Sequence, residues 1–262
     1  MRHESVVAVI LFAGSCVSAP EPEVGTPEVL TWPHSLGEQE VLDLLEDPAA
    51  EQGPSDTSTV DEARARAARR SAQLVAAASA PPSHAPDRYA VEFDTTGGSF
   101  TVEVVESAAP LAADRLHDLV TAGYFDGVPL YRVLEGRFLQ FGLHSDPAVN
   151  RAWQAAPLVD EPRLVSNRLG TIALVGGVGG RTTQVLVNLT DNLDLDGAGV
   201  VPFGYVVYGM KELLELEDRY GDGPPAGRGP DQREIFRRGS AYLMAAFPDL
   251  DVILEARVVA TN

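Results

Sequence analysis

The sequence predicts a mostly β protein: a closed antiparallel β-barrel capped by helices, preceded by a helical or disordered N-terminal extension. Three observations lead to this prediction. Short segments of alternating apolar and polar residues recur from residue 88 onward, glycine and proline turns separate them, and helical patterns are few. Closure of the sheet would remove the strand edges that otherwise pair with other chains.

The composition excludes some partners and allows a large core. The chain has 262 residues, a net charge of −18 and 45% hydrophobic residues. An acidic field of this size repels polyanions, so we expect no nucleic acid partner. Cys16 is the single cysteine, which rules out an internal disulfide and a thiolate metal site.

The first 19 residues have the pattern of an export signal. Ser5 to Ala13 form an apolar run too short to span a bilayer, and Gly14-Ser15-Cys16 follows it. A cysteine after small residues is typical of a bacterial lipoprotein signal, so we expect export to the periplasm or cell envelope and a lipid anchor on Cys16. Cleavage after Ala19 is one alternative, and a disordered start with a buried cysteine is another.

Three segments are expected between this signal and the barrel. Residues 20–57 are acidic, rich in proline and free of lysine and arginine, which predicts an unfolded tether. A short helix within 35–45 that docks on the main domain is the alternative. Residues 58–80 form an alanine-rich helix whose arginines we expect to be solvated. Residues 81–87 contain three prolines and form a linker.

Residues 88–262 supply the predicted barrel. A β-hairpin spans 89–104 with its turn at Thr96–Ser99, and a helix begins at Pro110 and ends at Gly123. Further strands are expected at 130–143 (a pair), 171–175, 185–189, 203–208 and 252–259. Further helical segments are expected at 210–220, after a capping box of Asp231 and Glu234, and at 242–247.

From about Arg88 to Val259 the chain resembles the cyclophilin-type peptidyl-prolyl cis-trans isomerases. The order and spacing of short motifs carry the resemblance: F-D-T-T-G-G at 93–98, G-Y-F-D-G at 123–127, Y-R-V at 131–133, Q-F-G at 140–142, N-R-L-G-T at 167–171, T-T-Q at 182–184, L-D-G at 195–197 and P-F-G at 202–204. Residues 144–150 and the tail 229–251 resemble a bacterial subgroup. The resemblance implies an eight-stranded barrel and a monomeric isomerase that needs no cofactor or metal and acts on proline-containing polypeptide segments.

The resemblance also assigns the site. Rotation about an X-Pro amide localises a lone pair on the prolyl nitrogen, and a cation that donates to this lone pair stabilises the twisted state. Arg132 corresponds to that cation, and Gln140 to the residue that orients it and the substrate carbonyl. The substrate-binding residues implied are Phe138, Gln184, Leu186 and Leu195.

Three positions depart from the family pattern. Arg137 stands where an aromatic residue is usual, Leu186 replaces a pocket phenylalanine, and Asp194 stands where a tryptophan often precedes Leu-Asp-Gly. Phe138 could replace the missing aromatic only if its strand bulged. The polar groups survive while the apolar pocket is thinned, which predicts weak or altered activity. The alternative is a module of this fold that binds Pro-containing segments with little turnover.

Three other patterns do not support a site. Residues 192–197 begin like a calcium loop, but Phe203 stands where its final acidic ligand is required. The glycine-rich segment 176–183 lacks the lysine of a phosphate-binding loop. His144, Ser145 and Asp146 are consecutive, so they cannot form a catalytic relay.

Overall fold

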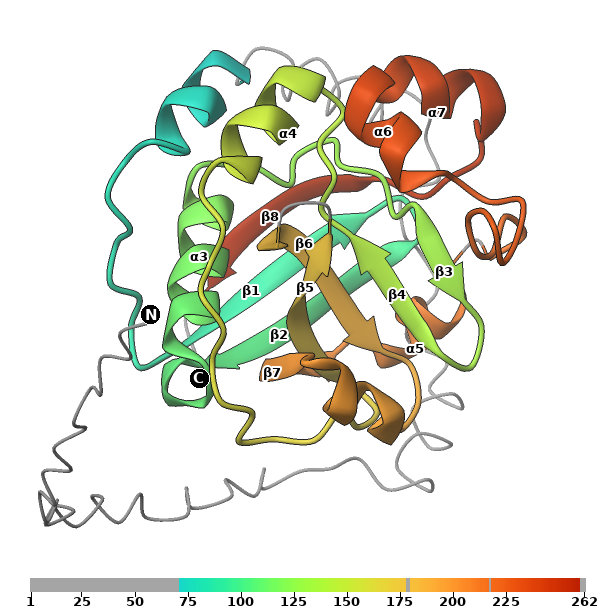
Figure 1. Ribbon diagram of the computed structural model, residues 1–262. Coiled ribbons are helices and arrows are strands. Elements are labelled where there is room, and N and C mark those ends of the chain that lie inside the picture. The colour runs from blue at the N-terminus through green and yellow to red at the C-terminus, as the bar shows by residue number, and fades with distance from the viewer. Residues whose placement is uncertain (1–70, 178–179, 217, 260–262) are drawn as a thin grey trace, which may run out of the picture.

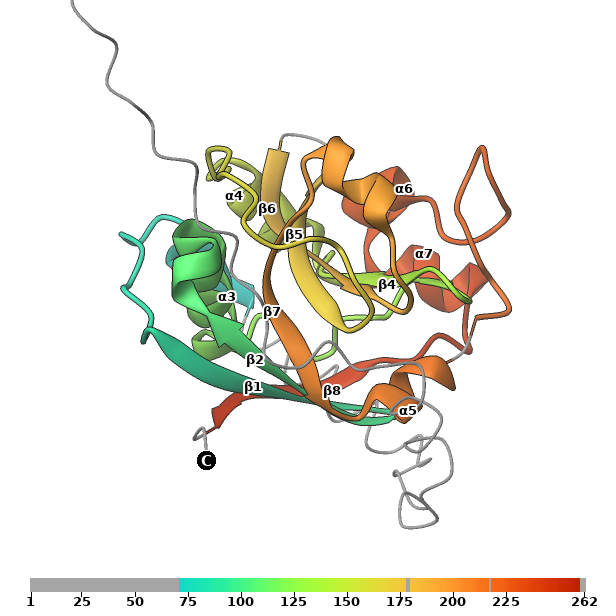
Figure 2. The same ribbon diagram turned by 90° about the horizontal axis from the view of Figure 1, so that it is seen from below.

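A curled antiparallel sheet dominates the computed structural model, which describes residues 71–177, 180–216 and 218–259. The strand order is β3-β4-β6-β5-β7-β2-β1-β8 (Figure 1, Figure 2). The strands are β1 (Arg88–Thr95), β2 (Gly98–Val105), β3 (Arg132–Leu134), β4 (Phe138–Phe141), β5 (Thr171–Gly177), β6 (Gly180–Asn188), β7 (Val201–Tyr208) and β8 (Ile253–Val259). The helices are α3 (Pro110–Thr121), α4 (Pro147–Gln154), α5 (Met210–Leu214), α6 (Gln232–Arg238) and α7 (Ser240–Ala246), with 3-10 turns η2 (Glu106–Ala108) and η3 (Leu193–Ala198).

The predicted closure of the barrel is wrong. Strands β3 and β8 are the two ends of the sheet order and share no ladder. Residues 127–130, just before β3, approach β8 instead, and the N–H of Gly127 donates to the carbonyl of Ile253 at 2.8 Å. Pro129 has no N–H to donate, so it makes only an isolated bridge to Val252. The two edges therefore meet over a few residues without a continuous ladder.

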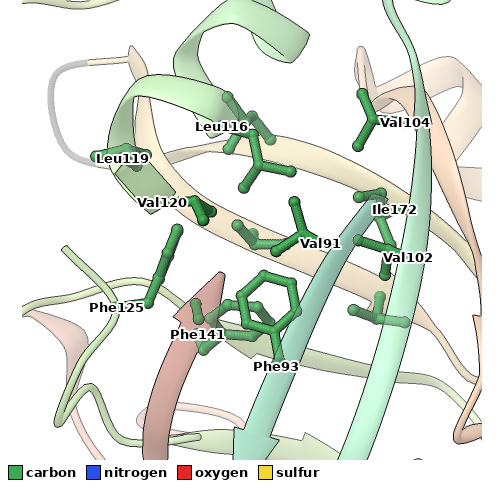
Figure 3. Close-up of a cluster of buried hydrophobic side chains, with 14 of the residues drawn as sticks. Val91, Phe93, Val102, Val104, Leu116, Leu119, Val120, Phe125, Phe141 and Ile172 are labelled. Atoms are coloured by element: carbon green, nitrogen blue, oxygen red, sulfur yellow. The ribbon is translucent and has the colours of Figure 1, made fainter. Parts of the chain in front are cut away.

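Aromatic and aliphatic side chains fill the inside of the curled sheet. Phe93 of β1 stacks on Phe100 of β2 with 4.9 Å between ring centroids, and it packs edge-on against Phe141 of β4. Figure 3 shows these strands facing a layer of α3 side chains, among which Leu116 is fully buried. The hairpin of β1 and β2 and the helix that begins at Pro110 are confirmed.

The C-terminal helices differ from the prediction in extent. The helix expected over 210–220 ends at Leu214, because the chain turns at Glu215 and buries Leu216. Asp231 does cap α6, since its carboxylate accepts from the N–H of Arg233. Its own N–H donates to the hydroxyl of Tyr242, so the expected capping box with a glutamate is not formed.

Helix α4 was not predicted, although its start has a clear signal. Asp146 accepts from the N–H of Ala148 as N-cap, and Pro147 occupies the first helical turn. Its buried Trp153 reaches the main core. The pattern Asp-Pro before an apolar face was therefore sufficient to find this helix.

The segment before β1 packs against the domain. Residues 71–77 are helical and bury Leu74 completely in the main core. Residues 81–86 have no regular structure, but the N–H of Ala85 donates to the Asp114 carboxylate of α3 at 2.8 Å. This part of the predicted linker is therefore held on the surface of the domain.

Several predictions for the N-terminal region fall outside the described residues. They are the export signal at 1–19, the lipidation of Cys16, the tether at 20–57 and the first part of the helix at 58–80. Within the described ranges, no helix is long and apolar enough to cross a membrane, and no group of acidic, histidine or cysteine side chains could hold a metal ion.

Candidate active site

The register of three neighbouring strands brings the predicted catalytic residues to one face of the sheet. Arg132 of β3 pairs with Gln140 of β4, which pairs in turn with Leu186 of β6. Residues directly opposite on neighbouring strands project to the same face, as do residues two apart along a strand. Phe138 and Gln184 therefore share this face with them.

Arg132 is held from three sides. Its Nη1 donates to Oε1 of Gln140 at 2.7 Å. On another edge of the guanidinium, Nε and Nη2 donate to the two carboxylate oxygens of Asp222 at 2.8 and 3.0 Å. The guanidinium carbon also lies 4.8 Å from the centre of the Phe138 ring, in cation–π geometry. These contacts fix the plane of the cation at the sheet surface.

A buried amide network supports Gln140 from behind. Its Nε2 donates to Oε1 of Gln184 at 2.8 Å, and the hydroxyl of Tyr131 donates to the same oxygen at 2.7 Å. Burial raises the pKa of Tyr131 well above its ordinary value, so this hydroxyl remains a donor at neutral pH. The amide orientation of Gln140 is thereby set, with its carbonyl oxygen pointing to Arg132.

Three of the four predicted substrate-binding residues meet in one apolar cluster. Phe138 and Leu186 are buried together with Val175 of β5, and Leu195 of η3 packs against them. The β3–β4 and β4–β6 ladders run without a register shift here. The bulge that Phe138 was expected to need is therefore absent, because Phe138 already shares a face with Gln140 and lies under Arg132.

Arg137 and Asp194, which stand in place of two family aromatics, form an ion pair with each other. Nη2 of Arg137 lies 2.6 Å from Oδ2 of Asp194, and Nη1 lies 3.3 Å from Oδ1. The hydrogen bond from Arg137 lowers the pKa of Asp194. Arg137 directly precedes Phe138 and Asp194 directly precedes Leu195, and both apolar residues belong to the cluster. Arg137 and Asp194 therefore form a polar rim beside the apolar cluster.

Asp222 was missed by the sequence analysis. It lies 90 residues from Arg132 in the chain, in an irregular segment between α5 and α6. A groove of about 530 Å³ lies beside Asp222. It is lined by Arg132 and by residues 222–226 and 230–233. The density of glycine and proline marks a loop, but no local pattern indicates which side chain that loop would contact.

The rejected motifs play structural roles in the described chain. Asp196 accepts from the backbone and side-chain N–H groups of Asn167, which takes up an oxygen that a calcium loop would need. His144 accepts at Nδ1 from the N–H of Asp146 and is buried. Burial lowers the pKa of His144 to about 4, so this imidazole stays neutral and orders the backbone before α4.

The arrangement offers a fixed cation beside an apolar cluster. A guanidinium has five N–H bonds; two are donated to Asp222 and one to Gln140, so donors remain for a ligand. A small apolar ring could contact the cluster while an atom bearing a lone pair faces the cation. No covalent nucleophile is needed for such a site to act, because stabilising developing charge is itself catalytic.

Comparison with known proteins agrees with this architecture. The family model of "Cyclophilin type peptidyl-prolyl cis-trans isomerase/CLD" matches residues 90–232. Peptidyl-prolyl cis-trans isomerase A of Dickeya dadantii is 26% identical over 141 residues, which is 53% of this chain and 74% of that protein. A peptidyl-prolyl cis-trans isomerase of Acinetobacter baylyi is 27% identical over 156 residues, 57% of this chain and 80% of that protein.

Among solved structures, a cyclophilin type peptidyl-prolyl cis-trans isomerase of Cryptosporidium parvum aligns with 67% of this chain and 99% of its own, at 18% identity and a TM-score of 0.48. The family match covers more than half of the chain. The chain therefore belongs to the cyclophilin-type peptidyl-prolyl cis-trans isomerase family, and the enzyme class expected from the sequence is confirmed.

Proposed function

We propose that this protein isomerises X-Pro bonds with Arg132 as the catalytic cation and assists the folding of exported proteins. The observation that carries the mechanism is the three-sided support of Arg132 beside the apolar cluster of Phe138, Leu186 and Leu195. The prolyl ring contacts the cluster, and a free N–H of Arg132 donates to the prolyl nitrogen as the amide twists. Planar amide nitrogen is a poor acceptor, so this bond favours the transition state.

The roles of the neighbouring residues follow from their contacts. Gln140 orients Arg132 and can donate to the substrate carbonyl, and Gln184 holds Gln140 in that orientation. Phe138, Leu186 and Leu195 bind the ring. No cofactor takes part in this mechanism, because the barrier is rotation about a partial double bond and no bond is broken.

The test is an isomerisation measurement on an Ala-Pro peptide by NMR exchange or a coupled assay. Wild-type protein should accelerate the exchange, and Arg132→Ala should lower kcat/KM by about 100- to 1,000-fold, the effect of removing a transition-state donor. Equal rates for both proteins above the buffer rate would refute the role of Arg132. If the exchange rate with wild-type protein equals the rate in buffer alone, the proposed isomerase activity is refuted.

A binding module with little turnover is the second candidate, favoured by the rim pair of Arg137 and Asp194. That pair replaces apolar contact area at the edge of the cluster. In this case Pro-containing peptides would bind, as measured by calorimetry, while the exchange rate would stay at the buffer value.

We also propose a bacterial origin, export and a lipid anchor on Cys16, with the catalytic domain acting as a monomer in the periplasm or cell envelope. The signal-like start and its Gly-Ser-Cys sequence support the anchor, and relatives from Dickeya and Acinetobacter fit the bacterial origin. Residues 71–77 lie on the opposite flank of the domain from β3 (Figure 1), so a tether leaving there would keep the site accessible.

Mass analysis of the mature N-terminus tests the anchor: acyl chains on Cys16 are expected, and an intact Met1 would refute export. Sedimentation of the domain tests the monomer.

A further inference from the structure

Residues 220–231, which lie between α5 and α6, form a wall of the candidate active site. It reaches Arg132 through Asp222, and both side chains are about three-quarters buried, with 23% and 28% exposed. We propose that Asp222 is a positioning and specificity-determining residue: it holds Arg132 and excludes carboxylate-bearing residues next to the client proline. This inference rests on the proposed function of Arg132.

The wall has a fixed backbone rather than an extended one. The N–H of Gly229 donates to the carbonyl of Asp222 at 2.7 Å, and that of Gly227 donates to Gly223 at 3.0 Å. A Cβ added at Gly227 would lie 2.2 Å from the Asp222 carbonyl oxygen, and one at Gly223 would lie 2.6 Å from that of Pro230. The close turns therefore require glycine and define where the Asp222 side chain begins.

Both ends of the wall are anchored to the C-terminal helices and the segment before β8. The Tyr220 ring packs edge-on against Phe247, the residue that follows α7, with 5.1 Å between ring centroids, and the Tyr220 hydroxyl donates to the Asp249 carboxylate. At the other end Asp231 caps α6 and donates its N–H to the Tyr242 hydroxyl. With both ends fixed, Asp222 is presented to Arg132 by the fold.

The contact decides which edges of the cation a client can reach. A carboxylate pairs best with a guanidinium through two parallel N–H bonds, and Asp222 already occupies the Nε and Nη2 edge in that way. A client carboxylate entering the adjoining groove meets this occupied edge and the negative charge of Asp222. Asp231 adds a second carboxylate to the groove lining, and the exposed Arg233 is the other cation among the lining residues.

Selection follows from this geometry. With Asp222 in place, an acidic residue beside proline meets the negative charge of Asp222 and an already occupied edge of Arg132, so its entry is opposed. Neutral and basic flanking residues enter at no such cost. The site should therefore prefer Ala-Pro to Glu-Pro segments, and Asp222 should set that preference.

The experiment compares Asp222→Asn with wild type on matched Ala-Pro and Glu-Pro peptides. Asparagine keeps the shape and removes the charge, so the ratio of kcat/KM for Glu-Pro over Ala-Pro should rise about five- to tenfold. Asp222→Glu restores the charge and should return the ratio toward wild type. Glu92→Gln is the matched control, because Glu92 pairs with Arg257 at a similar exposure on β1, and it should leave the ratio unchanged.

A second arm uses sulfate at constant ionic strength. Sulfate should inhibit Asp222→Asn competitively and leave wild type unaffected. An unchanged peptide ratio in a folded Asp222→Asn variant refutes the inference, because a merely structural role would lower both peptides alike. Should that variant not fold, competitive inhibition of wild type by sulfate refutes the inference, and resistance supports it.

Failure of the proposed function would look different. If wild type shows no turnover, the two peptides are compared by calorimetric binding instead, and the same change of ratio is expected in Asp222→Asn. Loss of turnover then counts against Arg132 as the catalytic cation, whereas an unchanged binding ratio counts against Asp222.

Discussion

Arg132 and Arg137 lie five residues apart on one hairpin, and each makes two contacts with an aspartate, yet their surroundings differ. Arg132 is 23% exposed and is also held by Gln140 and by the Phe138 ring. Arg137 is 45% exposed, and its partner Asp194 is 60% exposed. The network behind Gln140 continues into the buried Gln184 and Tyr131, whereas the exposed pair ends at solvent.

In the proposed mechanism, an ion pair with an aspartate is not by itself sufficient to make an arginine a catalytic cation. An exposed pair is screened by water and salt, so it contributes little and holds its partner loosely. A cation fixed by several donors and acceptors loses less freedom when a ligand arrives, and its field acts in a drier environment. We therefore expect the same residue type to serve catalysis at position 132 and only a solvated ion pair with Asp194 at position 137.

The largest difference is expected when each arginine is replaced by lysine. Arg132→Lys keeps the charge but loses the fork that contacts Asp222 and Gln140 at once. We expect kcat/KM on an Ala-Pro peptide to fall by about 100-fold, whereas Arg137→Lys should change it less than about twofold. Equal losses in both variants would show that the support around Arg132 is irrelevant.

His144, which follows this hairpin in sequence, is a polar residue that is buried without an ion-pair partner in the part of the chain that the structure describes. His144 is buried, and its Nε2 has no partner among the described residues, although Nδ1 is satisfied by the N–H of Asp146. Burial lowers its pKa from 6.5 to about 4. In the unfolded chain His144 thus binds a proton below pH 6.5, whereas in the folded chain it stays neutral down to about pH 4.

The stabilisation that comes from keeping His144 neutral should therefore be fully present above pH 6.5, and the free energy of unfolding should decline as the pH falls from 6.5 to 4. The contribution of His144 to this decline is at most about 3 kcal/mol. Urea unfolding across this range, compared between wild type and His144→Gln, measures it, with the exposed His84 changed to Gln as control. A parallel pH dependence in wild type and His144→Gln would contradict the depressed pKa.

A smaller effect is expected from the residue that links Arg132 to the buried network. Gln140→Leu keeps the volume but removes the acceptor for Arg132 and the donor to Gln184. We expect kcat/KM to fall by about tenfold, because Asp222 still holds the other edge of the guanidinium. Gln154→Leu on α4 is the control for a Gln-to-Leu change outside the site. Full activity in Gln140→Leu would mean that Asp222 alone orients Arg132.

Local signals predicted much of this hairpin and its neighbours. Arg132 and Gln140 are eight residues apart in the chain and lie directly opposite each other in the hairpin. The start of the helix at Pro110 likewise depends only on residues next to it in sequence. The closed barrel was predicted wrongly because closure depends on how Pro129 meets β8, more than a hundred residues away. Elements whose cause lay within a few residues were therefore predictable from the sequence, although α4 was missed despite its clear local signal.

Asp222 marks the limit for the site. Its contact with Arg132 depends on the path of the whole segment between α5 and α6, which has no periodicity for a sequence pattern to reveal. The ion pair of Arg137 and Asp194 was hidden for a related reason. Each residue was identified as a departure from the family pattern, but only the position of η3 beside β4 brings the two together.

The smallest effect is expected from returning an aromatic residue to position 137. Arg137→Phe extends the apolar cluster beside Phe138, so KM for an apolar X-Pro peptide should fall by about two- to fivefold while kcat stays the same. The pKa of the Asp194 carboxyl should also rise toward its ordinary value, because its main hydrogen-bond donor is gone. Titration followed by carboxyl-carbon NMR would measure this. Arg168→Phe, which breaks the exposed pair with Asp191 away from the cluster, should leave KM unchanged. If it lowers KM equally, the gain comes from general surface hydrophobicity, and the rim formed by Arg137 and Asp194 does not limit the pocket.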